Sequence, residues 1–276
     1  MLNKSHLNND IFKGLVEFRV SEKKDGDFKP SETDEFKKKI EAFRKETGVS
    51  KIIAPKPGNS GKVVVFGSEE LIAGPAGILR TKDVADGFII TTKDEPAAIM
   101  FAVADCPTAI VLAELGGKHY ALGIVHCGWK PLVEGVLDNL VLSMEKLHKD
   151  SLCGKQSSRY SMRVLITPGI GPCCFEVNED VAHQLATRYK KAQSVRNLYK
   201  MRCYIKNKGD KILVDIPKIC WCYFEERGAR DIAAMNICTK CSGQFFSHRR
   251  GDKERNLVAA FLTPQAYPQK NNLKRR

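Results

Sequence analysis

The hydrophobic residues of the chain are concentrated in short runs, and two of these runs form its centre. Thr108–Ala113 and Tyr120–Val125 are rich in Ile, Val and Ala, and Gly116 and Gly117 lie between them. Apolar runs of this length, joined through two glycines, predict two antiparallel strands connected by a tight turn. The outer ends of the two strands then meet at one edge of the hairpin.

Other stretches have the three-to-four-residue spacing of an amphipathic helix. One ends near Thr47, before Gly48, with Ser31 or Thr33 as its N-cap, and another spans Pro131–His148. Helices are also predicted over 176–190 and 216–227, and strands over 14–20, 51–54, 62–66, 87–92, 97–104, 162–167, 203–205, 211–214, 231–237, 245–247 and 257–262. Many short strands without regular alternation of strand and helix predict an α+β fold, with mixed β-sheets packed together and flanked by helices.

The length and composition fit a single globular domain. The chain has 276 residues, of which 43% are hydrophobic, enough for a substantial core. We predict a flexible tail over residues 1–10, one domain over 11–264 and a basic tail over 265–276. No apolar run approaches the ~20 residues of a membrane helix, and the polar N-terminus lacks the apolar core of a signal peptide. The expected location is therefore cytoplasmic, with no membrane partner.

The net charge of +13 bears on what the protein binds. The basic residues are spread along the chain and are not gathered in one segment with interleaved aromatic residues. Nucleic-acid binding is therefore not predicted. A diffuse positive surface attracts small anions such as phosphate, which is the simpler interpretation.

Cys106 precedes the first strand of the predicted hairpin and His126 follows the second, so the hairpin brings their side chains to one edge. Asp105, Cys127 and Lys130 lie at the same edge, where Asp105 either orients His126 or caps a turn. A thiolate beside an imidazole can form part of a zinc site or a Cys-His nucleophile pair. A structural alternative also stands, because an isolated Cys is often a small core residue.

The remaining cysteines do not form a disulfide framework. Without a secretory signal, free thiols are the expected state. Cys173 and Cys174 are adjacent, and Cys238 and Cys241 form a single CxxC motif. A structural zinc site needs about four ligands, and no second CxxC is present. We therefore interpret Cys238 and Cys241 as a pair of ordinary thiols in a loop.

Four segments, in this order, resemble a known family. They are ADCPTAIVL from residue 104, GIVHCGWK from residue 123, IGPCCFEV from residue 170 and ICTKCSGQFFSHRRGDKER from residue 237. They are similar to signatures of the laccase-domain, or multicopper polyphenol oxidase, family, whose members are regarded as zinc-dependent purine nucleoside phosphorylases. The resemblance covers roughly residues 85–262 and implies a single globular domain of packed sheets flanked by helices.

The resemblance implies a zinc site, but this chain lacks part of it. Cys106 and His126 match two of the family's three zinc ligands. The third, a His in a Gln-x-His-Gly segment, corresponds to Pro55–Gly58 here, which contains no His. Catalytic zinc has three protein ligands and an open position. Zinc is therefore implied with an incomplete ligand set, for which Cys127 or His248 is a candidate substitute.

The resemblance also implies a site for substrate and phosphate. Its residues are Lys130, Thr239, His248, Arg249, Arg250 and Arg255. The three arginines follow a Phe-Phe-Ser segment, and guanidinium groups suit an oxyanion such as phosphate. Lys130 stands where the family usually has Arg, which keeps the charge but loses the planar fork of donors.

Three functions follow from these residues. The resemblance implies a purine nucleoside phosphorylase that cleaves adenosine- or inosine-type nucleosides with phosphate. Because one zinc ligand is missing, a metal-independent Cys-His hydrolase or deamidase is the alternative, in which His126 activates Cys106. A catalytically inactive family member is the third. Phenol oxidation with copper is not expected, because ten Cys and few His provide no set of copper sites.

Overall fold

The computed structural model describes residues 11–116, 119–152, 160–190, 205–208 and 211–268. The predicted tail over 1–10 and most of the predicted basic tail lie outside these residues. The short 3-10 helix η5 (Pro264–Ala266) contains the buried Ala266, so packing extends past the predicted domain end at residue 264. Within the described ranges, none of the helices has the length and apolar character needed to cross a membrane.

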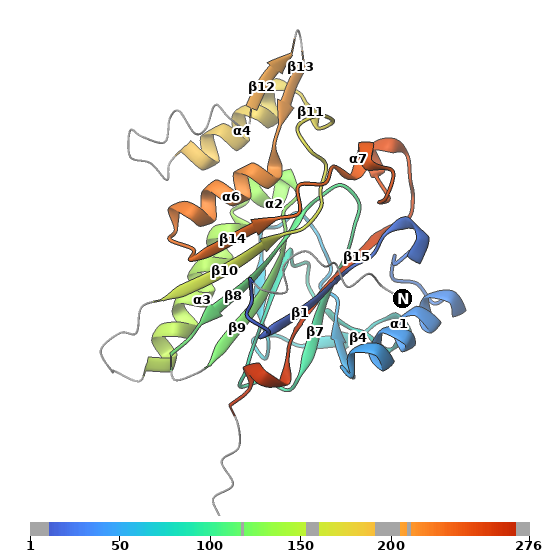
Figure 1. Cartoon of the computed structure of the whole chain (residues 1–276), viewed down its shortest axis with the longest axis vertical. Coiled ribbons are helices and arrows are strands. Elements are labelled where there is room, and N and C mark those ends of the chain that lie inside the picture. The colour runs from blue at the N-terminus through green and yellow to red at the C-terminus, as the bar shows by residue number, and fades with distance from the viewer. Residues whose placement is uncertain (1–10, 117–118, 153–159, 191–204, 209–210, 269–276) are drawn as a thin grey trace, which may run out of the picture.

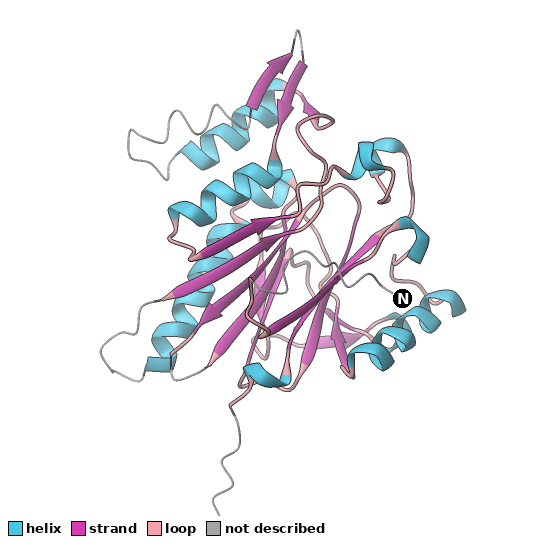
Figure 2. Cartoon of the chain, viewed as in Figure 1, coloured by secondary structure: helices cyan, strands magenta, loops and turns pink. Residues whose placement is uncertain are grey.

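Two six-stranded sheets and one small sheet form the scaffold (Figures 1 and 2). The first sheet contains, in spatial order, β1 (Val16–Val20), β15 (Asn256–Leu262), β7 (Ala97–Val103), β2 (Lys51–Ile53), β5 (Leu79–Thr81) and β4 (Leu71–Ala73). The second contains β14 (Asp231–Ala234), β10 (Ser161–Ile166), β8 (Thr108–Glu114), β9 (Tyr120–His126), β6 (Gly87–Thr91) and β3 (Val63–Val65). The third contains β11 (Glu176–Val177), β13 (Lys211–Val214) and β12 (Ile205–Lys208). Both large sheets combine parallel and antiparallel pairs, so the predicted α+β fold with mixed sheets is confirmed.

The two large sheets pack against each other around a shared core. In β15, Val258 and Ala260 pack in one cluster with Ile110 of the second sheet. The alternate residues Leu257 and Ala259 pack in a separate cluster with helix α1 (Asp34–Thr47). Successive side chains of a strand point to opposite faces, so β15 contributes to the core between the sheets and to the layer outside.

Helix α1 covers the outer face of the first sheet and has the predicted ends. The Thr33 hydroxyl accepts a hydrogen bond from the backbone N–H of Phe36 at 3.3 Å, which satisfies one donor of the first turn. Gly48 closes the helix in the left-handed conformation, with φ of 72°. Of the two N-caps considered, the structure therefore has Thr33.

The prediction of one helix over Pro131–His148 was wrong in one respect, because this segment forms two helices. α2 (Trp129–Val133) is followed by Gly135 with φ of 86°, and α3 (Val136–Leu152) begins after it. A left-handed residue interrupts an α-helix, and the apolar spacing continues across the break, so the spacing concealed it. α3 and α6 (Ile216–Glu226) pack on the outer face of the second sheet, and α4 (Glu179–Lys190) packs on α2 beside the small sheet (Figure 1).

Other predictions failed where segments are short. Residues 245–247 are not a strand, because the N–H and C=O groups of Phe246 are hydrogen bonded to the Asn256 side chain. The helix predicted over 176–190 begins only at Glu179, after strand β11. Strands β4 and β5 were not predicted. The remaining short elements are η1 (Lys23–Asp25), η2 (Pro75–Gly77), α7 (Thr239–Ser242) and η4 (His248–Arg250).

Candidate functional site

The hairpin of β8 and β9 brings Cys106 and His126 to one edge of the second sheet. Thr108 pairs with His126 across the strands, and Cys106 lies two residues before Thr108. A Cβ built on Gly128 would lie 3.2 Å from His126 Nε2 and 3.3 Å from Cys106 Sγ. The two reactive atoms therefore border one small space, and the Cys106 thiol is one of the groups that raise the pKa of His126.

Asp86, which the sequence analysis did not single out, holds the other side of the imidazole. Its Oδ1 lies 3.1 Å from His126 Nδ1, and its carboxyl group has no exposed surface. Its Oδ2 accepts hydrogen bonds from the backbone N–H and the hydroxyl of Ser60, at 2.6 and 3.1 Å. Cys106, His126 and Asp86 thus lie in the order thiol, imidazole and carboxylate, with the imidazole hydrogen bonded to the carboxylate. This is the order of groups found in Cys and Ser nucleophile systems.

The electrostatics of this chain favour a charged imidazole. Burial alone would lower the pKa of His126, but the negative charges of Cys106 and Asp86 and their hydrogen bonds outweigh it and raise the pKa to about 10. Burial alone would raise the pKa of Asp86, but the hydrogen bonds from His126 and Ser60 hold it below its ordinary value. At neutral pH the site therefore contains an imidazolium beside the carboxylate of Asp86.

Asp105 does not orient His126, because its hydrogen bonds are with other residues. Its Oδ1 accepts a hydrogen bond from the Thr239 hydroxyl at 2.6 Å, and its Oδ2 accepts one from the backbone N–H of Arg249 at 2.7 Å. Its carbonyl oxygen accepts from the backbone N–H of Ile170 at 2.6 Å. Asp105 therefore joins three loops, and Asp86 is the carboxylate that orients His126.

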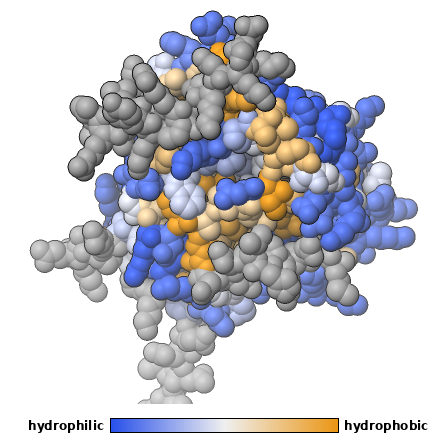
Figure 3. All heavy atoms as spheres, turned by 45° about the horizontal axis from the view of Figure 1, so that its top comes forward, coloured by the Kyte–Doolittle hydropathy of each residue, from blue (hydrophilic) through white to orange (hydrophobic). Residues whose placement is uncertain are grey.

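A pocket of about 390 Å³ opens beside Cys106. Its walls include the candidate residues Asp105, Cys106, Lys130, His248 and Arg249, together with Cys127, Trp129 and Phe175. Figure 3 brings the end of the molecule with β12 and β13 forward, and hydrophobic residues there lie in a recess bordered by hydrophilic ones. The pocket combines apolar walls, a thiol and cations, as sites for small polar ligands do.

Two cations of the pocket lie on aromatic rings. Lys130 Nζ is 5.5 Å from the centre of the Trp129 ring, and the Arg249 guanidinium is 5.2 Å from the centre of the Phe175 ring. Arg249 also donates to the carbonyl oxygen of Glu176 at 2.8 Å. The rings and this carbonyl fix where the positive charges lie, and both cations retain donors for an anion.

Two of the arginines predicted to bind phosphate do not line this pocket. Arg250 donates to the carbonyl oxygens of Thr239 and Lys240, at 3.2 and 2.7 Å, and pairs with Asp252. Arg255 donates to two neighbouring carbonyl oxygens of its own loop. Thr239 is buried and bound to Asp105. Of the predicted phosphate arginines, only Arg249 therefore lines the pocket.

The residues at Cys106 do not fit the three-ligand zinc site that the resemblance implies. Within the described residues, Cys106 and His126 belong to no group of three close His, Cys, Asp or Glu ligands. Cys127 is fully buried and its thiol points to the carbonyl oxygen of Val125, at 3.5 Å, so it is no substitute. Pro57, which replaces the family's His, lies exposed. Catalytic zinc needs three protein ligands, so the described residues around Cys106 do not fit a catalytic zinc ion.

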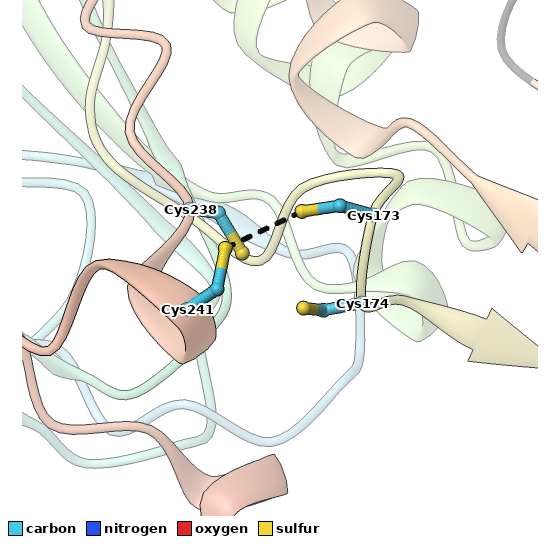
Figure 4. A group of neighbouring side chains, drawn as sticks. All are labelled: Cys173, Cys174, Cys238 and Cys241. Carbon is cyan, nitrogen blue, oxygen red and sulfur yellow. Dashed lines mark hydrogen bonds between the residues drawn. The ribbon is translucent and has the colours of Figure 1, made fainter.

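The interpretation of Cys238 and Cys241 as ordinary loop thiols is not supported by the structure. These two cysteines lie beside the adjacent pair Cys173 and Cys174, and all four sulfurs lie within 4.8 Å of one another (Figure 4). The sequence contains no second CxxC motif, so this group was not predicted. The signal was present in the adjacent cysteines of the IGPCC segment.

Relatives of known name match most of the chain. A purine nucleoside phosphorylase of Aquifex aeolicus (strain VF5) is 26% identical over 225 residues, which are 81% of this chain and 89% of that protein. A human purine nucleoside phosphorylase is 30% identical over 175 residues, 61% of this chain but only 35% of the human protein. The shared part is therefore about a third of the length of the human protein.

The fold is also found among solved structures. A crystal structure of a Neisseria meningitidis protein superimposes with a TM-score of 0.66 over 90% of this chain and 94% of that chain, at 19% identity. The sequence model named multi-copper polyphenol oxidoreductase laccase matches residues 32–262, most of the chain. The chain therefore belongs to the multi-copper polyphenol oxidoreductase laccase family.

Proposed function

We propose that this chain cleaves purine nucleosides with phosphate in the pocket beside Cys106, without a catalytic zinc at Cys106 and His126. The observation that carries the proposal is the convergence of Cys106, Lys130 and Arg249 on one pocket, with His126 Nε2 beside Gly128 of its wall. The names of the relatives support the reaction class. The apolar walls formed by Trp129 and Phe175 suit a purine, and the two cations suit phosphate.

The reaction requires two groups that the pocket provides. A phosphate oxygen forms a bond to C1′ of the ribose while the bond from C1′ to the purine nitrogen breaks, and the purine leaves with the electron pair. Lys130 and Arg249 hold the phosphate in place, which supplies orientation. His126 carries a proton at neutral pH, and Nε2 donates it to the departing base, as general acids do. Proton donation makes the purine a neutral leaving group.

A direct assay tests this proposal. Purified protein is incubated with inosine or adenosine, with and without phosphate, and free base and ribose phosphate are measured. We expect base release that depends on phosphate and continues after treatment with a chelator. Base release that needs no phosphate, or that stops on chelation even at saturating phosphate, contradicts the proposal.

Substitutions in the pocket distinguish binding from chemistry. Arg249→Met removes a charged hydrogen-bond donor, which is expected to raise the KM for phosphate by about tenfold or more. His126→Gln removes the proton donor and is expected to lower kcat by about a hundredfold. Arg255→Met serves as the matched control, because Arg255 binds only carbonyl oxygens of its own loop, and its KM and kcat are expected to stay unchanged.

We propose, as a second candidate, hydrolysis of an amide at the same residues. The hydrogen bond that His126 Nδ1 donates to Asp86 Oδ1 favours it, because it completes a Cys-His-Asp arrangement. The Cys106 thiolate attacks the carbonyl carbon, the carbon–nitrogen bond breaks, and His126 protonates the leaving amine. Water then hydrolyses the thioester and restores the thiol.

Thiol reactivity separates the two candidates. If Cys106 is a nucleophile, iodoacetamide labels it faster than the other cysteines, and His126→Gln and Asp86→Asn slow the labelling. Peptide mapping by mass spectrometry gives the rates. Labelling of Cys106 at the rate of an ordinary thiol contradicts the hydrolase. Absence of both activities would leave the third expectation, an inactive family member.

A further inference from the structure

Four cysteines from two distant segments meet at the surface next to the pocket. Cys173 and Cys174 lie in the turn that precedes β11, whereas Cys238 and Cys241 belong to the first turn of α7 (Figure 4). Their four sulfurs are all within 4.8 Å of one another, and the sulfurs of Cys173 and Cys241 are 3.5 Å apart. All four are free thiols.

The backbone around these cysteines is held by hydrogen bonds within the protein. The backbone N–H groups of Cys174 and Phe175 both donate to the carbonyl oxygen of Gly171, at 3.0 and 2.9 Å, which forms the tight turn. The Gly171 N–H donates to Cys238 Sγ at 3.3 Å. Backbone donors to a sulfur stabilise its thiolate, and such donors surround thiolates that bind metals.

Gly171 also makes room for the sulfurs. A Cβ at this position would lie 3.3 Å from Cys238 Cβ and 3.5 Å from Cys173 Sγ. Its φ is not in the left-handed region, so the need for glycine is steric. Arg250 fixes the opposite side, because it donates to the carbonyl oxygens of Thr239 and Lys240 inside the CxxC turn. Both halves of the cluster are therefore held by the fold.

We propose that Cys173, Cys174, Cys238 and Cys241 bind one zinc ion as a tetrahedral structural site. Zinc bound by four thiolates at about 2.3 Å requires sulfur–sulfur separations of about 3.8 Å. The four sulfurs lie within 4.8 Å of one another. Small side-chain rotations are therefore enough to bring them to the separation that zinc requires. Soft thiolate sets select zinc over magnesium, calcium or manganese. Because all four positions are filled by protein, the site has no open position for a substrate.

The proposed zinc site joins two chain segments that continue to the pocket, one through Phe175 and the other through Thr239. Cys174 is followed by Phe175, whose ring lies under the Arg249 guanidinium. Cys238 is followed by Thr239, which donates to Asp105. A zinc ion that joins the two segments would therefore hold the wall that carries Arg249. This role is independent of the reaction performed at Cys106.

Metal analysis of the full chain tests the proposal. The protein is purified under reducing conditions without chelator, and zinc is measured by mass spectrometry. We expect about one zinc per chain in the unmodified protein and in Cys106→Ser. We expect loss of zinc in the double variant Cys173→Ser/Cys241→Ser. Both substituted residues are exposed, so neither change disturbs the core, and circular dichroism verifies folding.

Two further measurements identify the ligands. Cobalt added to the metal-free protein is expected to give the strong near-ultraviolet absorption of thiolate–cobalt bonds, which the double variant lacks and Cys106→Ser retains. Cys241→His is expected to keep the metal, since three Cys and one His also bind zinc, whereas Cys241→Ala weakens it. A role in packing alone would not distinguish these two variants.

Three outcomes would overturn the inference. The first is unmodified protein that binds neither zinc nor cobalt. The second is zinc that stays in the double variant but is lost in Cys106→Ser, which would assign the metal to the pocket. The third is a Cys173–Cys241 disulfide in protein purified without reductant, with no thiolate–cobalt absorption after reduction.

Discussion

Asp86 and His126 are joined twice, through their side chains and through their backbones. Asp86 Oδ1 lies 3.1 Å from His126 Nδ1, and the His126 backbone N–H donates to the Asp86 carbonyl oxygen at 2.7 Å. The pairing of Gly87 with Val125 in β6 and β9 places the two residues opposite each other. One residue therefore fixes both the position of His126 and the orientation of its ring, so that Nε2 faces Cys106.

Replacing Asp86 by Asn tests this relationship. The amide keeps a hydrogen-bonding group near Nδ1 but removes the negative charge that helps to raise the pKa of His126. We expect the pKa of His126 to fall, and kcat of the proposed phosphorolysis to fall by about ten- to a hundredfold. Titration of the His126 ring by NMR and steady-state kinetics measure the two effects.

Asp83→Asn is the matched control for this change. Asp83 precedes Asp86 by three residues, its side chain is 75% exposed, and its recorded ion pair is with Lys62. Exposed pairs of this kind contribute little, so the control is expected to leave kcat and the pKa of His126 as they are. Equal losses in both variants would show that Asp86 acts through local stability alone.

The pH dependence of stability is predicted for Asp252. Burial opposes ionisation of this carboxyl group, but the backbone N–H of Ser247 and the side chains of Arg250 and Lys23 lower its pKa from 3.8 to about 2. A lowered pKa adds stability that is complete above the unfolded value and is lost as the pH falls through the folded value. The stabilisation is therefore full above pH 4 and disappears toward pH 2.

Urea unfolding of the unmodified protein and of Asp252→Asn measures this effect. The difference in the free energy of unfolding between the two is expected to be constant between pH 5 and 7. It is expected to shrink below pH 4, as the Asp252 carboxyl group of the unfolded chain takes up its proton. A difference that stays constant from pH 6 down to pH 3 would contradict the assignment.

Thr239 is predicted to stabilise the loops through Asp105. Thr239→Val keeps the shape but removes the hydroxyl that donates to Asp105 Oδ1 at 2.6 Å. A buried carboxylate then loses a hydrogen bond, which costs about 1–3 kcal/mol. Thr239→Ser restores the donor and is expected to recover most of the loss. Thermal unfolding gives the comparison, and equal destabilisation by Val and Ser would refute this role.

The sequence was most informative where a local pattern determines the structure. Thr33 and Gly48 mark the ends of α1, and the hairpin brings Cys106 and His126 together, because capping and strand alternation are properties of neighbouring residues. The family resemblance was confirmed for the same reason, since it rested on ordered local motifs. Local patterns do not reveal which strands pair when they are far apart in sequence.

The residues that the sequence did not reveal depend on such distant pairing. Asp86 reaches His126 only because β6 pairs with β9, across 40 positions of sequence. Cys173 reaches Cys241 only because the loop after β10 lies beside α7, across 68 positions. Arg250 was predicted to bind phosphate because it matches the basic segment of the family, whereas in the structure it donates to backbone carbonyl oxygens. Charge and residue type alone did not show these partners.

Gly128 is predicted to control the contact between His126 and Cys106. Its φ of −68° is open to any residue, so Gly128→Ala introduces no backbone strain. The new Cβ would lie 3.2 Å from His126 Nε2 and 3.3 Å from Cys106 Sγ, closer than ordinary van der Waals contact, so the two groups must separate slightly. Small displacements of reacting groups cost up to about a hundredfold in rate. We expect kcat to fall at least about tenfold, with thermal stability nearly unchanged.

Iodoacetamide labelling of Cys106 gives a second measure of the same displacement, because it moves the thiol away from the imidazole of His126. Gly67→Ala is no suitable control, since Gly67 has φ of 80° and would be strained. Gly169→Ala tests the opposite case, because its Cβ would collide with Pro107 at 2.6 Å and is expected to lower stability. If Gly128→Ala instead lowers the melting temperature as much as Gly169→Ala while kcat is retained, the glycine serves packing and not the reactive pair.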